Sequence, residues 1–160
     1  MTDLESSPAR IFTRPGDIDS VQTLAAKKLQ AGRLLIEESS CFFEDVVLHF
    51  GDEIVVKHLR DNEFDLIEII RPSAMRHYFY VIGGQFSNKE GFRPHQSMED
   101  VLFELGGQWE CDMGGLFQLH VPRCYVDTFV SRTGWALSPE SEIFSGAPDI
   151  NIEDSDSRAK

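Results

Sequence analysis

The stretch that decides the fold lies between residues 77 and 137, where HYFYVIGG (77–84) is followed after a loop by QSMEDVLFELGGQWECDMGGLFQLHVPRCYVDTFVSRTGWAL (96–137). The first run is rich in aromatic and β-branched residues and ends at Gly83-Gly84, which predicts a strand buried on at least one face. Ser97 with Asp100 three residues later resembles a capping box, and the apolar residues after it predict an amphipathic helix that ends at Gly106.

The rest of this stretch continues the alternation of strands and helices. Two apolar-rich runs at 108–111 and 116–121 flank a glycine-containing loop, which predicts a β-hairpin. Pro122 then begins a helix with apolar residues four apart, and a short strand at 135–137 follows. The order βαββαβ predicts a ferredoxin-like antiparallel sheet with both helices on one face.

The N-terminal half has a different pattern of apolar residues. From Asp17 onward, Ile18, Val21, Leu24 and the apolar residues that follow have helical spacing, which predicts a helix. Between residues 34 and 71, short β-like runs separated by turns predict three or four strands. The predicted fold class is therefore α+β: an N-terminal helix and a small β-barrel or meander packed with a C-terminal ferredoxin-like βαββαβ unit.

The composition predicts how the chain is divided. A polar start with two prolines predicts a flexible arm, and a Ser-, Pro-, Asp- and Glu-rich end predicts an acidic disordered tail. Pro72-Ser73-Ala74 is the predicted hinge inside a single globular domain. The predicted divisions are the arm 1–16, the domain 17–137 with a helix plus β-meander at 17–72 and a ferredoxin-like half at 73–137, and the tail 138–160.

The formal net charge is −12, and residues 34–137 alone contribute −9. An acidic surface repels nucleic acid and anionic lipid and favours a basic partner, although solubility alone also accounts for such a charge. No apolar run approaches the roughly 20 residues of a membrane span, and the N-terminus lacks the apolar core of a secretory signal. These features predict a cytoplasmic protein without nucleic-acid or membrane partners.

Three cysteines without a C-x-x-C pair predict neither a disulfide framework nor a thiolate zinc site. Cys111 and His120 fall on the paired strands of the predicted hairpin, so a thiolate–imidazole pair is one candidate for nucleophilic catalysis. The five histidines have no metal-ligand spacing. Because no family signature surrounds the cysteines, we predict no catalytic residue. The histidine spacing predicts no metal, and no cofactor is expected.

A long loop at 86–96 carries basic and aromatic side chains, and long loops on rigid scaffolds often bind partners, although a plain surface loop is the alternative. Acidic residues follow it on the predicted helix and hairpin. The candidate binding residues are Lys89, Phe92, Arg93, His95, Glu99, Asp100, Glu110 and Asp112.

Some of these positions resemble a small bacterial family known only as a domain of unknown function. The resemblance spans about residues 35–135 and is carried by turn and core positions, while the step Ser73 to Arg76 departs from the histidine-containing step of that family. It implies a bacterial source and a fold, and no activity. The matching residues are Gly51, Asp52, Val55, Trp109, Glu110, Val121 and Pro122.

Charge and the lack of an assembled reaction centre in the sequence together predict a non-enzymatic acidic binding protein, of the type of a bacterial immunity protein or antitoxin-like inhibitor, with a basic toxin or effector as its partner. One alternative is a small-molecule-binding or regulatory domain, which includes a homodimer formed edge to edge. A second alternative is an enzyme that uses Cys111 with His120.

Overall fold

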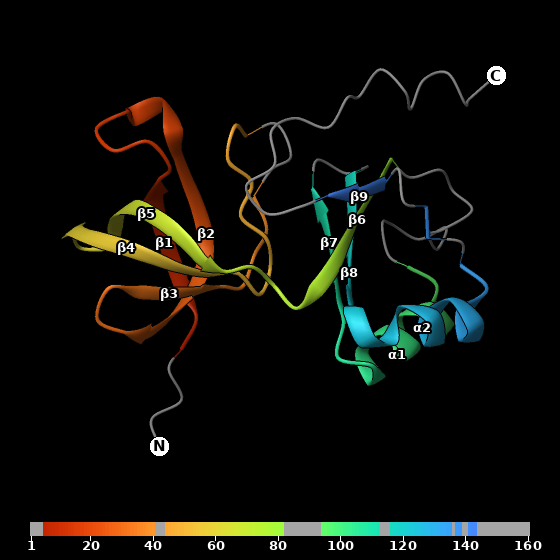
Figure 1. The fold of residues 1–160 in the computed structure, drawn as a ribbon. Coiled ribbons are helices and arrows are strands. Elements are labelled where there is room, and N and C mark those ends of the chain that lie inside the picture. Colours follow the sequence, from red (N-terminus) through yellow and green to blue (C-terminus); the bar gives the residue numbers. More distant parts are fainter. Residues whose placement is uncertain are drawn as a thin grey trace. The chain divides into compact units, whose positions relative to one another are not determined.

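The computed structural model describes residues 5–40, 44–81, 94–112, 116–135, 137–138 and 141–143. The chain divides into two compact units between Ser73 and Ala74, within the Pro72-Ser73-Ala74 step at which the hinge is predicted. The first unit is a β-barrel and the second a four-stranded sheet with two helices (Figure 1). Each unit is described here by itself.

The barrel unit is a closed meander in which each strand pairs with the next along the chain. The first and last strands close it in parallel, with Ile11 opposite Phe64, because an odd number of alternating strands must leave one parallel pair. A single 3-10 turn, η1 (Ile18–Ser20), precedes the second strand. The strands are β1 (Ser7–Phe12), β2 (Val21–Gln30), β3 (Arg33–Ile36), β4 (Glu53–Arg60) and β5 (Glu63–Arg71).

Apolar side chains that alternate along these strands fill the barrel. Burying a valine, leucine, isoleucine or phenylalanine side chain there stabilises the fold by about 1.5–3 kcal/mol relative to leaving it exposed. The buried cluster consists of Ala9, Ile11, Leu24, Ala26, Leu34, Ile36, Leu48, Ile54, Val56 and Phe64.

The predicted N-terminal helix is wrong, and with it the predicted fold class. Beyond the short turn η1, residues 21–30 form strand β2, in which Gln22, Leu24 and Ala26 are the buried positions. They alternate with a period of two, as a strand requires. Both units are built around sheets, and the described helices are few and short.

The physical reason for this error is a buried glutamine. The amide of Gln22 donates to the carbonyl of Val46 at 2.9 Å, and its oxygen accepts a hydrogen bond from the Ser40 hydroxyl. A polar residue at an inward position hides the period of two, and the remaining apolar residues then happen to have helical spacing. Strand pairing with β1 and β3 decides the conformation instead.

Two further N-terminal predictions also need correction. The predicted flexible arm 1–16 contains β1, which pairs with both β2 and β5 and so completes the barrel. The β-like run at 41–50 forms no strand in its described part, residues 44–50. Val47, Leu48 and His49 are nevertheless buried there, so this segment packs inward without joining a ladder.

The sheet unit has the element order strand, helix, strand, strand, helix, strand, and its strands lie in the order β7-β8-β6-β9. All pairs are antiparallel. The second helix follows directly on a 3-10 turn, η3 (Arg123–Tyr125). The elements are β6 (Met75–Val81), α1 (Gln96–Glu104), β7 (Gln108–Asp112), β8 (Leu116–Pro122), α2 (Val126–Thr133) and β9 (Glu142–Ile143).

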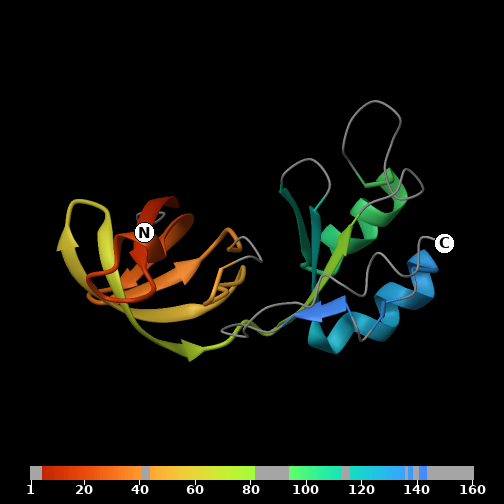
Figure 2. The same ribbon diagram turned by 90° about the horizontal axis from the view of Figure 1, so that it is seen from above.

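The register separates the two faces of this sheet. Both helices cover one face, as Figure 2 shows, and there they bury Tyr78, Phe117, Leu119 and Val121. The helices contribute Met98 and Leu102 from α1 and Phe129 from α2. The opposite face carries His77, Gln118 and His120, which are polar and still buried.

The last strand differs from the prediction. The expected strand at 135–137 is not observed in its described residues; instead Trp135 packs on the rings of Tyr80 and Phe117. The strand β9 pairs with β6 from within the region predicted as a disordered tail. The remainder of that tail, from residue 144, lies outside the described residues.

Candidate functional site

Two buried histidines and a half-buried glutamate are linked by hydrogen bonds across the sheet unit. His77 on β6 and His120 on β8 are directly paired in register, and their Nδ1 atoms lie 2.8 Å apart. Nε2 of His120 lies 2.5 Å from a carboxylate oxygen of Glu110 on β7. His120 is fully buried and His77 is 4% exposed. The Glu110 side chain is 19% exposed, so the group extends from the buried histidines toward solvent.

The hydrogen bonds of this group constrain its protons. A carboxylate only accepts, so Nε2 of His120 carries the proton shared with Glu110. Between the two Nδ1 atoms, one nitrogen must donate and the other accept. The contact between the two rings is therefore one hydrogen bond, with one Nδ1 as donor and the other as acceptor.

Of the acidic candidate residues, the three whose side chains are described do not gather on one surface. Glu110 lies on the sheet face opposite the helices, whereas Glu99 on α1 is buried and accepts a hydrogen bond of 2.8 Å from the indole of Trp109. Asp100 is exposed and accepts from Gln96 one turn earlier at 2.7 Å. These three carboxylates therefore have three different surroundings, and the structure does not bring them together as one binding surface.

The predicted loop site is described only at its end. Lys89, Phe92 and Arg93 lie outside the described residues. His95 is exposed and stands at the N-cap of α1 without a side-chain cap hydrogen bond. Asp112 ends β7 opposite Leu116, and its side chain lies outside the described set.

The predicted approach of Cys111 to His120 is wrong. On β7, Gln108 is paired with His120, and Cys111 is paired with Phe117. Because successive residues of a strand point to opposite faces, Cys111 shares the helix-covered face with Phe117, whereas His120 points to the other. The register of the hairpin therefore separates the thiol from the imidazole.

The Gly51-Asp52 turn has a structural explanation. The Asp52 carboxylate is fully buried and accepts hydrogen bonds of 2.8 Å from the backbone N–H groups of His49 and Ser73. It thereby joins the start of β4 to the end of the barrel unit. Gly51 has a φ of +92°, and a Cβ built there would lie 2.6 Å from the Ser73 hydroxyl oxygen. These two positions of the resemblance thus serve the fold of the barrel.

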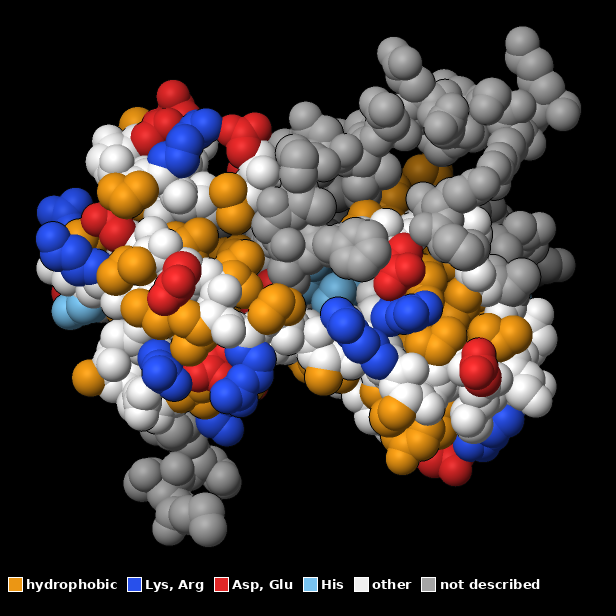
Figure 3. Space-filling model, in the orientation of Figure 1, with side chains coloured by type: hydrophobic (Ala, Val, Ile, Leu, Met, Phe, Trp, Pro, Cys, Tyr) orange, Lys and Arg blue, Asp and Glu red, His pale blue; other side chains and the backbone are white. Residues whose placement is uncertain are grey.

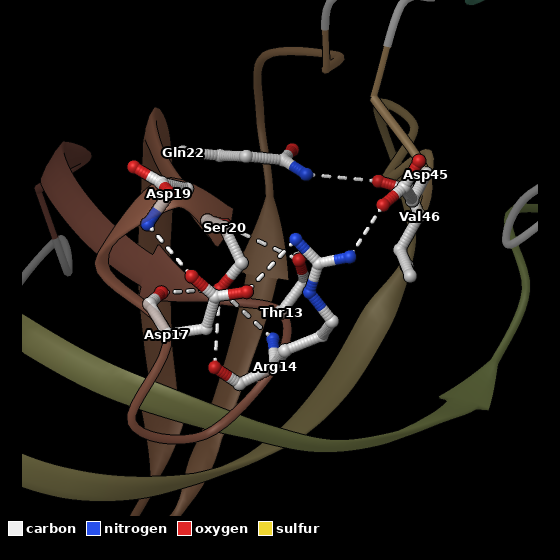
Figure 4. Close-up of polar contacts among 8 residues, drawn as sticks. All are labelled: Thr13, Arg14, Asp17, Asp19, Ser20, Gln22, Asp45 and Val46. Atoms are coloured by element: carbon white, nitrogen blue, oxygen red, sulfur yellow. Dashed lines mark hydrogen bonds and ion pairs between the residues drawn. The ribbon is translucent and has the colours of Figure 1, made fainter.

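A second polar cluster fixes the loop between β1 and β2 (Figure 4). The single hydroxyl proton of Ser20 is shared between the carbonyls of Asp17 at 2.8 Å and Arg14 at 3.1 Å, and the hydroxyl oxygen accepts from the Arg14 N–H. The Arg14 guanidinium reaches Asp17 at 2.9 Å and Asp45 at 2.6 Å. Together with the Gln22–Val46 hydrogen bond, this cluster attaches the loop to the segment after residue 44.

Most of the described arginines form ion pairs with carboxylates. Glu63 contacts both Arg10 and Arg60, and Glu53 contacts both Arg33 and Arg71. The hydrogen bond from Arg60 lowers the pKa of the Glu63 carboxyl. On the face drawn in Figure 3, acidic and basic side chains accordingly lie next to one another within each unit.

A further ion pair connects the two helices of the sheet unit. Arg132 on α2 donates to Glu104 on α1 at 2.8 Å, and this hydrogen bond lowers the pKa of the Glu104 carboxyl. Arg76 on β6 likewise lies 3.6 Å from Glu142 on β9. Such exposed pairs add little stability, because solvent and salt screen them, but they neutralise the cations locally.

Among the described residues, no group of three or more histidine, cysteine, aspartate or glutamate side chains is arranged to hold a metal ion. Of the helices that can be described, none has the length and apolar character needed to cross a membrane.

The sequence did not predict the contacts among His77, His120 and Glu110; Glu110 was named only as a candidate binding residue and as a position of the resemblance. The sequence does contain a signal for part of this group. Gln118 and His120 interrupt an otherwise apolar strand at alternate positions, so both point to one face. That signal identifies a polar sheet face, but the partner His77 follows only from the pairing of β6 with β8.

Comparisons with known proteins add little. No protein-family model matches the chain, and no curated protein matches it. Among solved structures, the chain is similar to a hypothetical protein from Neisseria gonorrhoeae, with 14% identity and a TM-score of 0.48 over 79% of this chain and 83% of that one. At this level the likeness carries no argument about function. The resemblance to a bacterial domain of unknown function stays a prediction.

Proposed function

We propose that this protein is a non-enzymatic acidic binding protein of the cytoplasm, of the type of a bacterial immunity protein or antitoxin-like inhibitor, which associates with a basic protein. The observation that carries the proposal is the even distribution of charge along the chain. Residues 1–73, which hold the barrel, carry 14 acidic and 8 basic side chains; residues 74–160 carry 13 and 7. Each part therefore has a net charge of −6.

The ion pairs strengthen this argument. Seven of the described arginines contact a carboxylate, so their charge is neutralised within the protein. Asp19, Glu68 and Asp127 are exposed and make no ion pair within the described residues. A basic partner therefore meets a negative field, which accelerates encounter when the ionic strength is low.

The enzyme alternative loses its supporting geometry, because Cys111 and His120 point to opposite faces of the sheet. The alternative of a small-molecule-binding or regulatory domain has no observation among the described residues that favours it. Binding of a basic protein is thus the function that we infer.

The test begins by capturing proteins from the native lysate on the purified full-length chain at low salt and identifying them. The association rate of the purified partner is then measured by stopped flow over a range of ionic strength. We expect the double variant Asp19→Lys and Glu68→Lys to lower the low-salt association rate by about tenfold or more, because these exposed carboxylates contribute to the field.

The matched control is the double variant Asp19→Glu and Glu68→Asp, which changes the same positions and keeps their charge. It should bind like the wild type. The proposal fails if the captured partner is not basic, or if its association rate is independent of salt.

A further inference from the structure

The barrel unit carries a basic surface at the end where two of its hairpins turn, and this surface has no part in the proposed function. Strands β2 and β4 are both antiparallel to β3, so they run in the same direction and finish at the same end of the barrel. Their last residues are alike, KKLQ (27–30) on β2 and KHLR (57–60) on β4. We propose that this basic hairpin end, residues 27–33 and 57–65, binds an acidic segment of a partner protein that also carries apolar side chains.

The charge of the basic hairpin end is opposite in sign to that of the residues around it. Residues 27–33 and 57–65 carry five basic and three acidic side chains, a net charge of +2. Residues 1–73 as a whole have a net charge of −6, so the rest of them carry −8. On the face drawn in Figure 3, basic side chains lie over the tip of the β4–β5 hairpin. An acidic segment is therefore attracted to this end and repelled by the rest of the unit.

Three lysines of this end have charge that is available to a partner. Lys28 and Lys57 are exposed and Lys27 is half-buried, and none of the three forms an ion pair with a carboxylate of the described residues. Arg60, by contrast, is paired with Glu63 at 2.9 Å. A partner carboxylate can contact the lysines without displacing an existing ion pair, so its attraction is not offset by a lost contact.

Aromatic contacts hold two of the polar side chains in place. The ammonium of Lys28 lies 5.8 Å from the centroid of the Phe64 ring, and the His58 ring lies 5.4 Å from the same ring. Nε2 of His58 donates to the carbonyl of Asp61 at 2.9 Å, since a carbonyl only accepts. Phe64 is itself buried in the barrel cluster. Side chains that are already ordered lose less conformational entropy when a partner binds.

Two exposed leucines favour a protein segment over a nucleic acid as the occupant. Leu29 is 39% exposed and Leu59 is 43% exposed, and each lies within one of the two basic strand ends. A phosphate backbone is bound through charge and hydrogen bonds and offers such side chains no apolar partner. An acidic segment with apolar side chains covers the leucines and neutralises the lysines together.

The experiment uses the purified full-length protein and a fluorescein-labelled peptide with the repeat Glu-Glu-Leu, and it follows binding by fluorescence anisotropy. We expect binding that weakens as salt is added, because salt screens the lysine charges. Lys28→Glu and Lys57→Glu should each weaken binding by about threefold or more. The matched control is Arg123→Glu, which makes the same change of charge at an exposed residue of the sheet unit and should bind nearly as the wild type does.

A second pair of variants tests the apolar contribution. Leu59→Ser should weaken binding of the Glu-Glu-Leu peptide, whereas Ile67→Ser, at a position on β5 that is 61% exposed, should leave binding unchanged. A peptide with the repeat Glu-Glu-Gly should bind the wild type more weakly than the Glu-Glu-Leu peptide. Circular dichroism checks that each variant is folded.

Three results would overturn the inference: no binding of the Glu-Glu-Leu peptide to the wild type at low salt, equal effects of Lys57→Glu and Arg123→Glu, or tighter binding of oligothymidylate than of the peptide. The inference can fail separately from the proposed function. The double variant Asp19→Lys and Glu68→Lys, which tests the basic partner, should not weaken binding of the acidic peptide.

Discussion

Gly51 has a left-handed backbone conformation in a crowded place, and the two properties can be separated by substitution. Its φ is +92°, and a Cβ would lie 2.6 Å from the Ser73 hydroxyl oxygen. Gly16 has a similar φ of +78°, but a Cβ there would have no neighbour within 4 Å. The comparison of these two glycines therefore isolates the close approach to Ser73.

We expect Gly51→Ala to lower the free energy of unfolding by about 1–3 kcal/mol, because it combines an unfavourable φ with a steric clash. Gly16→Ala should cost less, since it has only the unfavourable φ. The measurement is urea denaturation of both variants. Adding Ser73→Ala to Gly51→Ala should recover part of the loss, and equal losses for Gly51→Ala and Gly16→Ala would contradict the role of Ser73.

At the scale of elements, the junction between α1 and β7 also depends on a glycine that permits a close approach. A Cβ on Gly107 would lie 2.4 Å from a methyl carbon of Leu102 and 2.6 Å from the carbonyl oxygen of His120. The helix and the hairpin can approach this closely only because residue 107 has no side chain. Gly106, next to it, has open space where a Cβ would be.

Gly107→Ala should therefore destabilise the sheet unit by about 1–3 kcal/mol or more, since the His120 carbonyl is backbone and cannot rotate away. Hydrogen exchange should show the loss in α1, β7 and β8. Gly106→Ala has a positive φ of +85° but no clash, and it serves as the control. If Gly106→Ala costs more than Gly107→Ala, the close packing at this junction does not limit stability.

Helices and strands were predicted correctly where the spacing of apolar residues along the chain matches the face that is buried in the fold. The helix that ends before Gly106 and the hairpin from residue 108 both form, because their apolar spacing matches the faces that they bury. The predicted capping box is wrong, since the helix begins at Gln96 with His95 at its N-cap and Ser97 lies inside it.

The N-terminal helix was wrong because Gln22 is satisfied by Ser40 and Val46, which are remote in sequence. A contact of that kind is not encoded in local periodicity.

At the scale of the whole molecule, the two units have separate hydrophobic clusters that share no buried residue. Ile54 is fully buried in the barrel cluster and Leu119 in the cluster of the sheet unit. Truncating either side chain leaves a cavity in its own cluster. We therefore expect each truncation to lower stability mainly in the unit that contains the truncated side chain.

Ile54→Ala and Leu119→Ala should each lower stability by about 2–5 kcal/mol. Hydrogen exchange should locate the loss in the barrel for the first variant and in the sheet unit for the second, and the effects of the double variant should be additive. Loss of protection spread equally over both units by either variant would show that the clusters do not behave independently.

The sequence by itself determined the alternation of strands and helices between residues 77 and 134, the acidic charge and the turn at Gly51-Asp52. Each depends on neighbours within a few residues or on composition. Only the tertiary structure decided that β1 and β5 close a barrel, that Cys111 and His120 lie on opposite faces, and that His77 meets His120. The physical reason is strand register: a shift of one residue moves a side chain to the other face, and register is set by partners distant in sequence.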